Sequence, residues 1–144
     1  METYVDLHAL VQAAGDAIVV ADVEGLIVLW NPAAERLFGF TAAEAVGHSL
    51  DLIIPARFRE RHWRGYHTVM RTGQTRYHAD VLRVPALRKD GQRLSIAFTV
   101  ALLYASDGHL TGIAALVRDD TERWQEEQAL RQRLAELEER GGTA

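Results

Sequence analysis

Apolar residues recur along this chain with two different periods, and each period predicts a different kind of element. Alternation of apolar and polar positions predicts strands, because successive side chains of a strand point to opposite faces. The clearest alternation runs from Leu94 to Leu102, where every second residue is a large apolar one. Short apolar runs between turn residues predict further strands. The expected strands lie at 17–21, 26–30, 76–87, 93–103 and 110–117.

Apolar positions three and four residues apart predict helices ahead of these strands and between them. The expected helices lie at 4–14, 33–38 and 55–73. Pro55 and Gly73 bound the longest of them, and these residue types are preferred at helix starts and ends respectively. The string Thr41-Ala-Ala-Glu44 has the form of a capping box, which predicts one more short helix.

Together the elements predict an α+β domain with a five-stranded antiparallel sheet and helices packed on one face. Hairpin turns join most strands, and the mostly apolar strand at 110–117 is expected near the centre of the sheet. A chain of 144 residues is long enough for one such domain with a core of its own. We expect an N-terminal helical cap at 1–15 and a core at 16–120. A linker with a coiled-coil helix is expected at 121–140, followed by a flexible tail at 141–144.

The segment at 121–140 differs in character, because it is rich in Glu, Arg and Gln and has no Gly or Pro. Leu130, Leu134 and Leu137 recur there at spacings of four and three residues, which is typical of a short coiled-coil seam. A single helix docked on the body of the domain is the alternative. Three leucines in a charged surface favour instead a helix that dimerises or passes on a signal.

The junction ahead of this helix is charged. Asp119 or Asp120 is expected to cap the helix, because the free N–H groups at a helix start favour a carboxylate. Arg118 is expected to pair with a carboxylate on the core. We therefore expect this joint to couple the last strand to the helix.

Composition and charge narrow the classes of function. Hydrophobic residues make up 48% of the chain and charged residues 25%, as in ordinary soluble globular proteins. A net charge of −4 offers no general attraction to nucleic acid or to an anionic membrane, so neither is an expected partner. No apolar run approaches the roughly 20 residues of a membrane span. The first six residues lack the basic start and apolar stretch of a signal peptide, so none is expected. A cytoplasmic protein is expected.

Familiar catalytic patterns are missing from the sequence. The chain has no Cys, which excludes disulfides, thiolate chemistry and Cys-ligated metals. It has no Gly-rich phosphate loop, no Gly-x-Ser-x-Gly elbow and no His-Glu-x-x-His motif. No histidine pair or carboxylate cluster has the spacing of a zinc or non-heme iron site. An enzyme is therefore not expected.

His62 is the residue of this sequence whose surroundings bear most directly on function. On the helix at 55–73, Phe58, His62, Tyr66 and Val69 fall on a single stripe, while the arginines point elsewhere. A histidine in an apolar stripe is either held by a hydrogen-bond partner, such as a backbone carbonyl or Tyr66, or bound to a ligand. The residues alone leave both interpretations open.

Several strings, in this order and spacing, resemble a PAS domain over about residues 5–122. These strings lie at 16–22, 25–40, 44–47, 88–91 and 117–123. The last of them contains the Asp-x-Thr pattern that joins a PAS core to a downstream helix. The resemblance implies a sensory module that forms a homodimer and relays a signal through its exit helix to a downstream effector.

Within that family, residues 50–91 are most similar to FixL-type heme-binding PAS domains. The run at 55–62 matches the approach to their proximal histidine, which implies that His62 is the axial ligand of the iron of heme b. A neutral imidazole on a rigid helix in an apolar pocket suits this role. The resemblance implies a pocket lined by Phe58, Tyr66, Val69, Met70, Leu82, Phe98, Val100, Ala115 and Val117. It implies Arg76 as the first candidate for a heme propionate, with His67, Arg71 and His78 as others.

The distal side departs from the family pattern. Leu82 stands where FixL-type domains have a distal arginine, and Asp80 stands where heme-PAS phosphodiesterases have a distal methionine. Arg83 is adjacent to Leu82, but in a strand it should face the opposite side. The resemblance implies a sensor of a diatomic gas or of redox state. The alternative is a heme-free PAS module that dimerises or binds another small molecule, with His62 in a structural role.

Overall fold

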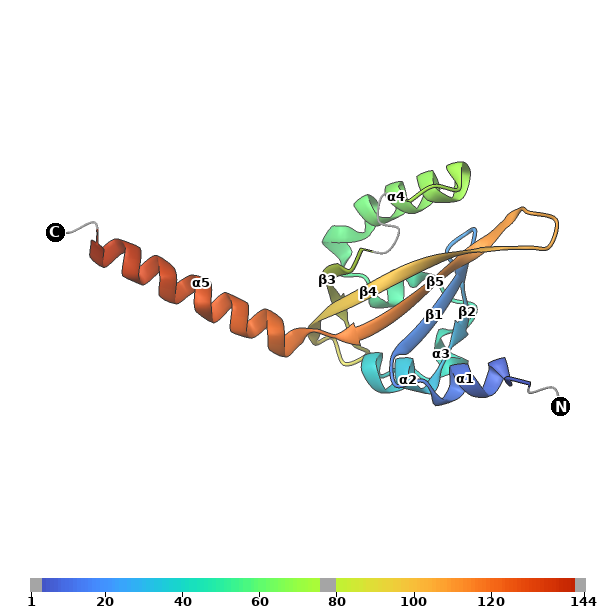
Figure 1. The fold of residues 1–144 in the computed structure, drawn as a ribbon, viewed down its shortest axis with the longest axis horizontal. Helices are drawn as coiled ribbons and strands as arrows, with labels where there is room; N and C mark the ends of the chain where they lie inside the picture. Colours follow the sequence, from blue (N-terminus) through green and yellow to red (C-terminus); the bar gives the residue numbers. More distant parts are fainter. Residues whose placement is uncertain (1–3, 76–79, 142–144) are drawn as a thin grey trace.

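Within the described residues, five antiparallel strands form the sheet on which the domain is built (Figure 1). The computed structural model describes residues 4–75 and 80–141. The strands are β1 (Ala17–Asp22), β2 (Ile27–Trp30), β3 (Leu82–Leu87), β4 (Arg93–Tyr104) and β5 (Leu110–Asp119). Their order is β2-β1-β5-β4-β3, so the mostly apolar β5 lies at the centre of the sheet. The predicted α+β class and antiparallel sheet are confirmed.

The third strand is shorter than predicted. It begins at Leu82, whereas the prediction placed its start at residue 76. Residues 76–79 lie outside the described part of the chain, and Asp80 and Val81 belong to no strand. β3 is an edge strand that pairs only with the first half of β4. A single ladder orders such a strand, and the polar stretch ahead of Leu82 offers little apolar surface to extend it.

The helices follow the predicted pattern with different bounds. They are α1 (Leu7–Ala13), α2 (Pro32–Phe38), α3 (Ala42–Ala45), α4 (Arg59–Thr72) and α5 (Thr121–Gly141), with 3₁₀ turns at Leu50–Ile53 and Ala56–Phe58. α1 begins three residues later than predicted, because the Asp6 side chain accepts the Ala9 N–H at 3.0 Å and caps the helix there. The capping box predicted for α3 is present, with both of its hydrogen bonds.

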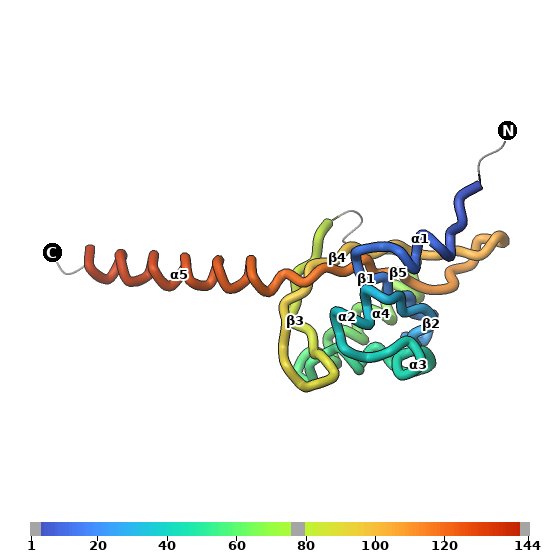
Figure 2. Tube along the Cα trace, turned by 90° about the horizontal axis from the view of Figure 1, so that it is seen from below, coloured from blue at the N-terminus to red at the C-terminus, as the bar shows by residue number. Residues whose placement is uncertain are grey.

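The helix predicted at 55–73 is divided. The Pro55 carbonyl accepts the Phe58 N–H at 2.9 Å, which forms a 3₁₀ turn before α4 begins at Arg59. The predicted end is confirmed, since Gly73 follows α4 in a left-handed conformation with φ of 68°. Three helices, α2, α3 and α4, lie on the same side of the sheet in Figure 2.

The tightly packed core lies between α2, α3 and the inward face of the sheet, and all five strands contribute buried residues to it. Phe38, Ile27 and Ala34 are completely buried within it. Asn31 is also completely buried, and its side chain ties three segments together. Its amide oxygen accepts the N–H groups of Ile18 at 2.8 Å and Ala34 at 3.0 Å, and its amide nitrogen donates to the Val11 carbonyl at 2.9 Å. A buried side chain with this many partners defines the start of α2.

The junction after β5 agrees with its predicted chemistry. Arg118 Nε lies 2.7 Å from Asp16 Oδ1, which is the predicted pairing with a carboxylate on the core. The Asp119 side chain accepts the Thr121 N–H at 2.9 Å at the start of α5. α5 then extends away from the domain (Figure 1), and none of its residues is buried.

Candidate cofactor site

Two aromatic side chains fasten α4 to the turn between β1 and β2. Tyr66, the buried residue of α4, donates its hydroxyl hydrogen to the Asp22 carbonyl. The Trp63 ring lies on Gly25, where an added Cβ would stand 2.2 Å from the ring. Gly25 also has φ of +85°, so both space and backbone conformation require glycine there. The far end of α4 is held near the end of β4, where the Tyr104 hydroxyl donates to the Gly73 carbonyl at 3.3 Å.

His62 lies half-buried beside these anchors. Its ring centroid is 4.7 Å from that of Trp63 and 5.7 Å from that of Tyr66. Its Nδ1 atom is buried and has no hydrogen-bond partner among the described residues. The two partners predicted for a structural histidine therefore do not serve this atom, since Tyr66 donates to Asp22 instead. A buried polar atom without a partner is costly and is a recognised feature of functional sites.

The surroundings of His62 favour its neutral form. Burial lowers its pKa from the ordinary value, the nearby His67 acts in the same direction, and the carboxylate of Asp51 opposes both. An imidazole with a lowered pKa is neutral at pH 7 and keeps a nitrogen lone pair. This is the form that can coordinate a metal ion.

The inward face of the sheet provides a second, apolar wall. Leu82 of β3, Phe98 of β4 and Val117 of β5 lie side by side across three strands. Val100 and Ala115 form the next inward pair of β4 and β5. Val117 is buried, with 3% of its surface exposed, but the other four are only half-buried. The structure thus brings the predicted sheet residues into one continuous patch that the helices only partly cover.

The remaining predicted residues divide into two groups. Phe58, Val69 and Met70 are half-buried on α4 and the turn before it. His67, Arg71 and Asp80 are exposed. Arg76 and His78, predicted near a propionate, lie outside the described residues. Arg83 interacts with Asp120 and not with the residues around Leu82, in agreement with the prediction that it faces the opposite side.

Asp51 is a member of this site that sequence reasoning missed. Its carboxylate accepts the indole N–H of Trp63 at 2.7 Å and lies 3.8 Å from Arg59 Nε. It also opposes the lowering of the pKa of His62. No spacing rule relates Asp51, in a 3₁₀ turn, to residues on α4, so only the folded chain brings them together.

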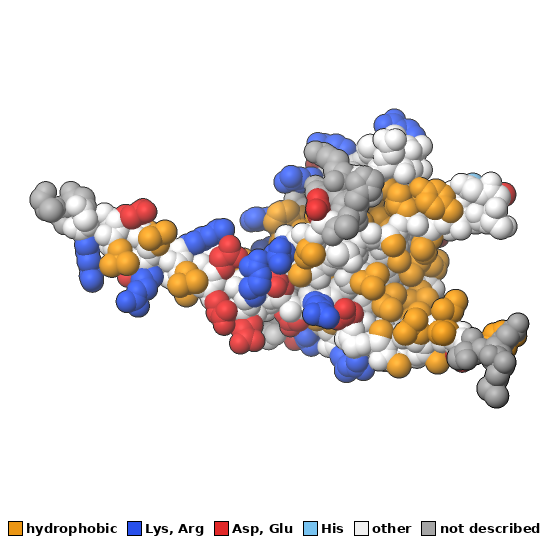
Figure 3. Space-filling model, in the orientation of Figure 1, with side chains coloured by type: hydrophobic (Ala, Val, Ile, Leu, Met, Phe, Trp, Pro, Cys, Tyr) orange, Lys and Arg blue, Asp and Glu red, His pale blue; other side chains and the backbone are white. Residues whose placement is uncertain are grey.

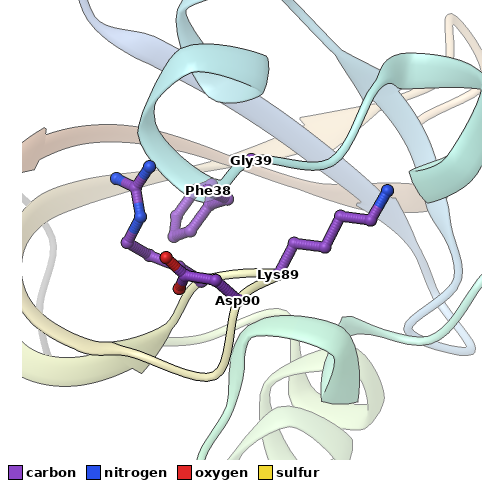
Figure 4. Close-up of a pocket in the computed structure, with 5 residues that line it drawn as sticks. Phe38, Gly39, Lys89 and Asp90 are labelled. Atoms are coloured by element: carbon purple, nitrogen blue, oxygen red, sulfur yellow. The ribbon is translucent and has the colours of Figure 1, made fainter.

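A hollow lies between the end of α2 and the turn that joins β3 to β4. It measures about 410 Å³ and is lined by Phe38, Gly39, Arg88, Lys89 and Asp90 (Figure 4). Its two cations already have partners. Arg88 donates to the Leu37 carbonyl at 2.7 Å, and the Lys89 ammonium group pairs with the Glu44 carboxylate. That pairing, together with the Thr41 backbone, lowers the pKa of Glu44 to about 2.

The described residues contain neither a cluster of metal ligands nor a membrane-spanning helix. Residues 4–75 and 80–141 contain no group of three or more His, Cys, Asp or Glu side chains arranged to hold a metal ion. A heme needs only one such ligand, because its porphyrin supplies the other four. In the same part of the chain, none of the helices has the length and apolar character needed to cross a membrane.

A family model and a solved structure both match this fold. The family model described as the PAS fold matches residues 6–119. The crystal structure of a PAS domain from Colwellia psychrerythraea superposes with a TM-score of 0.70 at 22% identity, covering 81% of this chain and 95% of that one.

Three curated relatives match most of this chain. An uncharacterized protein of Azorhizobium caulinodans is 36% identical over 129 residues, covering 89% of this chain and 17% of the relative. The sensor protein FixL of Bradyrhizobium diazoefficiens is 31% identical over 133 residues, covering 91% and 26% respectively. The oxygen sensor protein DosP of Escherichia coli is 27% identical over 106 residues, covering 74% and 13%. The chain therefore spans about a quarter or less of the length of each relative.

Proposed function

This chain belongs to the PAS family, and on that premise we propose that it is a sensory domain that holds heme b through His62. The observation that carries the proposal is the buried Nδ1 atom of His62, which has no hydrogen-bond partner in the described part of the chain and sits in a neutral ring. The half-covered apolar wall on the same side of the sheet as α4 supports it. So does the likeness to FixL, named a sensor protein, and to DosP, named an oxygen sensor protein.

The residues of the chain have distinct roles in this proposal. His62 holds the iron, and when bound the heme supplies a centre for a diatomic gas or a change of redox state. Leu82 takes the place of a polar distal group, so no side-chain donor is expected there for a bound gas. Apolar contacts come from Phe58, Tyr66, Val69 and Met70 on one side and from Leu82, Phe98, Val100, Ala115 and Val117 on the other. Arg76 is proposed to pair with a propionate.

Heme titration followed by absorption tests the assignment of His62. Purified protein should develop a Soret band, and His62→Ala should lose or shift it. His8→Ala is the control, because it removes an exposed histidine of α1, outside the proposed site, and should leave the band in place. A parent protein that stays colourless contradicts the proposal and favours the heme-free module. Native mass spectrometry of the protein as purified would then identify any other small molecule.

The partner we propose is a second copy of this chain, joined through α5. α5 is 21 residues long and exposes the three leucines of its seam. The exposed fractions are 68% for Leu130, 58% for Leu134 and 53% for Leu137. A helix in a protein takes most of its stability from the packing of its apolar face, so pairing of the apolar seam is expected to stabilise α5. In Figure 3 the apolar side chains of α5 face the same side as those over the sheet and α1. A copy that pairs with the seam can therefore also cover the sheet.

The dimer can be tested on the helix itself. Leu134→Glu introduces a charge into the seam, and ultracentrifugation should show a clear shift toward monomer. Gln132→Glu adds the same charge on the opposite side of α5 and should leave the dimer intact. Equal weakening by both substitutions would argue against the seam. The proposal also includes a cytoplasmic location and a downstream effector that receives the signal. We expect the effector to correspond to the parts of the relatives that this chain does not cover.

A further inference from the structure

A row of alternating charges runs from β3 into α5. Arg83 Nε lies 3.5 Å from Asp120 Oδ2, and Arg123 Nε lies 3.6 Å from Asp120 Oδ1. Arg123 Nη1 continues to Glu127 Oε2 at 2.9 Å, and Arg131 Nη2 lies 3.1 Å from Glu127 Oε1. We call these five residues the charge row. It joins an edge strand of the sheet to the first half of the exit helix.

Asp120 is the most buried member of the charge row. Its side chain is only 12% exposed, whereas the other four side chains are 41% to 68% exposed. Its carboxylate is therefore the one most removed from water, and it depends most on its two arginines. Asp120 occupies the middle position of the Asp-x-Thr junction, so its charge is additional to the Asp119 contact that begins α5.

The backbone around Asp120 is attached to β4 as well. Its N–H donates to the Ser95 carbonyl at 2.7 Å, and the Thr121 hydroxyl accepts the Ser95 N–H at 3.0 Å. One residue of β4 thus holds the first residue of α5 and the residue before it. Arg83 of β3 reaches the same point through its side chain. Asp120 is where β3, β4 and α5 meet.

Arg83 is also the immediate neighbour of Leu82. Leu82 faces inward next to Phe98, in the wall of the candidate site, and Arg83 faces outward to Asp120. β3 is an edge strand, so a single neighbouring strand restrains it. A shift of β3 at its inward face therefore changes the distance from Arg83 to Asp120, and with it the charges that hold the start of α5.

We propose that the charge row is the output link of this domain, with Arg83 as the positioning residue that couples β3 to α5. Partly exposed ion pairs are individually weak, so small movements at the pocket suffice to redistribute them. The coupling from β3 to α5 stands on contacts in the chain itself. Only the identity of the signal that shifts β3, which is heme or its ligand, rests on the proposed function.

Hydrogen exchange in the heme-free protein tests the coupling alone. In Arg83→Gln, amides at 121–127 should exchange about two- to fivefold faster than in the parent, the factor that corresponds to a partly exposed ion pair. Arg93→Gln is the matched control, since it removes an exposed strand arginine outside the charge row and should change nothing at α5. Unchanged exchange in Arg83→Gln overturns the proposal.

A double-mutant cycle separates a direct contact from general damage. Asp120→Asn should accelerate the same amides, and Arg83→Gln combined with Asp120→Asn should be no worse than the more severe single variant. Effects that simply add would overturn a direct link between the two residues. High salt should bring the parent toward Arg83→Gln, because screening weakens exposed pairs.

Heme titration then tests the connection to the candidate site. In the parent, heme should change exchange at 121–131, and in Arg83→Gln this change should be lost while the Soret band still forms. A parent that binds heme without any change at α5 overturns the link from pocket to helix. A parent that binds no heme contradicts the proposed function and leaves the result in the heme-free protein standing.

Discussion

The inward face of the sheet has a closed half and an open half, which differ in how completely other elements cover them. In the closed half, Phe38 and Ile27 are completely buried, and Ile96 of β4 belongs to the same buried cluster. In the open half, farther along β4, Phe98 and Val100 stay half-buried although they face the same side of the sheet. The difference indicates a division of labour. One half stabilises the fold by close packing, and the other leaves apolar surface free for a ligand.

The largest effect should come from opening the closed half. Phe38→Ala removes a completely buried ring whose centroid lies 5.3 Å from that of the Trp30 ring. We expect the free energy of unfolding to fall by about 3–5 kcal/mol, because a cavity remains where little can collapse into it. Urea unfolding followed by circular dichroism measures this loss. A loss below about 1 kcal/mol would mean that the two halves are packed alike.

The matched change in the open half should cost less. Phe98→Ala removes the same side chain from a half-buried position, so we expect a loss of about 1–2 kcal/mol by the same measurement. It should also weaken heme binding in a titration, whereas Phe38→Ala should weaken it only as far as it unfolds the domain. Equal stability losses in the two variants would contradict the comparison.

The smallest expected effect is a gain. His62→Leu replaces a half-buried ring whose Nδ1 lacks a partner among residues 4–75 and 80–141, so the heme-free protein should become more stable by about 1 kcal/mol at pH 7.5. The same substitution should abolish the Soret band after heme addition. His8→Leu, at an exposed position outside the proposed site, is the control. A clear loss of stability in His62→Leu would indicate a structural histidine.

The pH dependence sharpens this last test. Burial lowers the pKa of His62 in the folded protein, so the unfolded chain binds its proton more readily. The free energy of unfolding of the parent should therefore fall as pH drops through about 6.5, the ordinary histidine value. Because His62→Leu removes this group, the stability difference between variant and parent should widen from pH 7.5 to pH 5.5. A constant difference would contradict the lowered pKa.

Much of the fold follows from short-range patterns in the chain. Alternation from Leu94 to Leu102 predicted β4, the Thr41–Glu44 capping box predicted α3, and Gly73 predicted the end of α4. Each rests on geometry within a few residues, which a sequence displays directly. The stripe with His62 was predictable for the same reason.

Only the tertiary structure decided what surrounds those residues. It set how far the helices cover Phe98 and Val100, it placed Asp51 beside Trp63, and it brought Arg83 to Asp120. These relations depend on strand register and helix placement between segments far apart in the chain, which no local period encodes. Periodicity tells which face a side chain takes. The packing of distant elements decides whether that face is closed, paired with a charge, or left open.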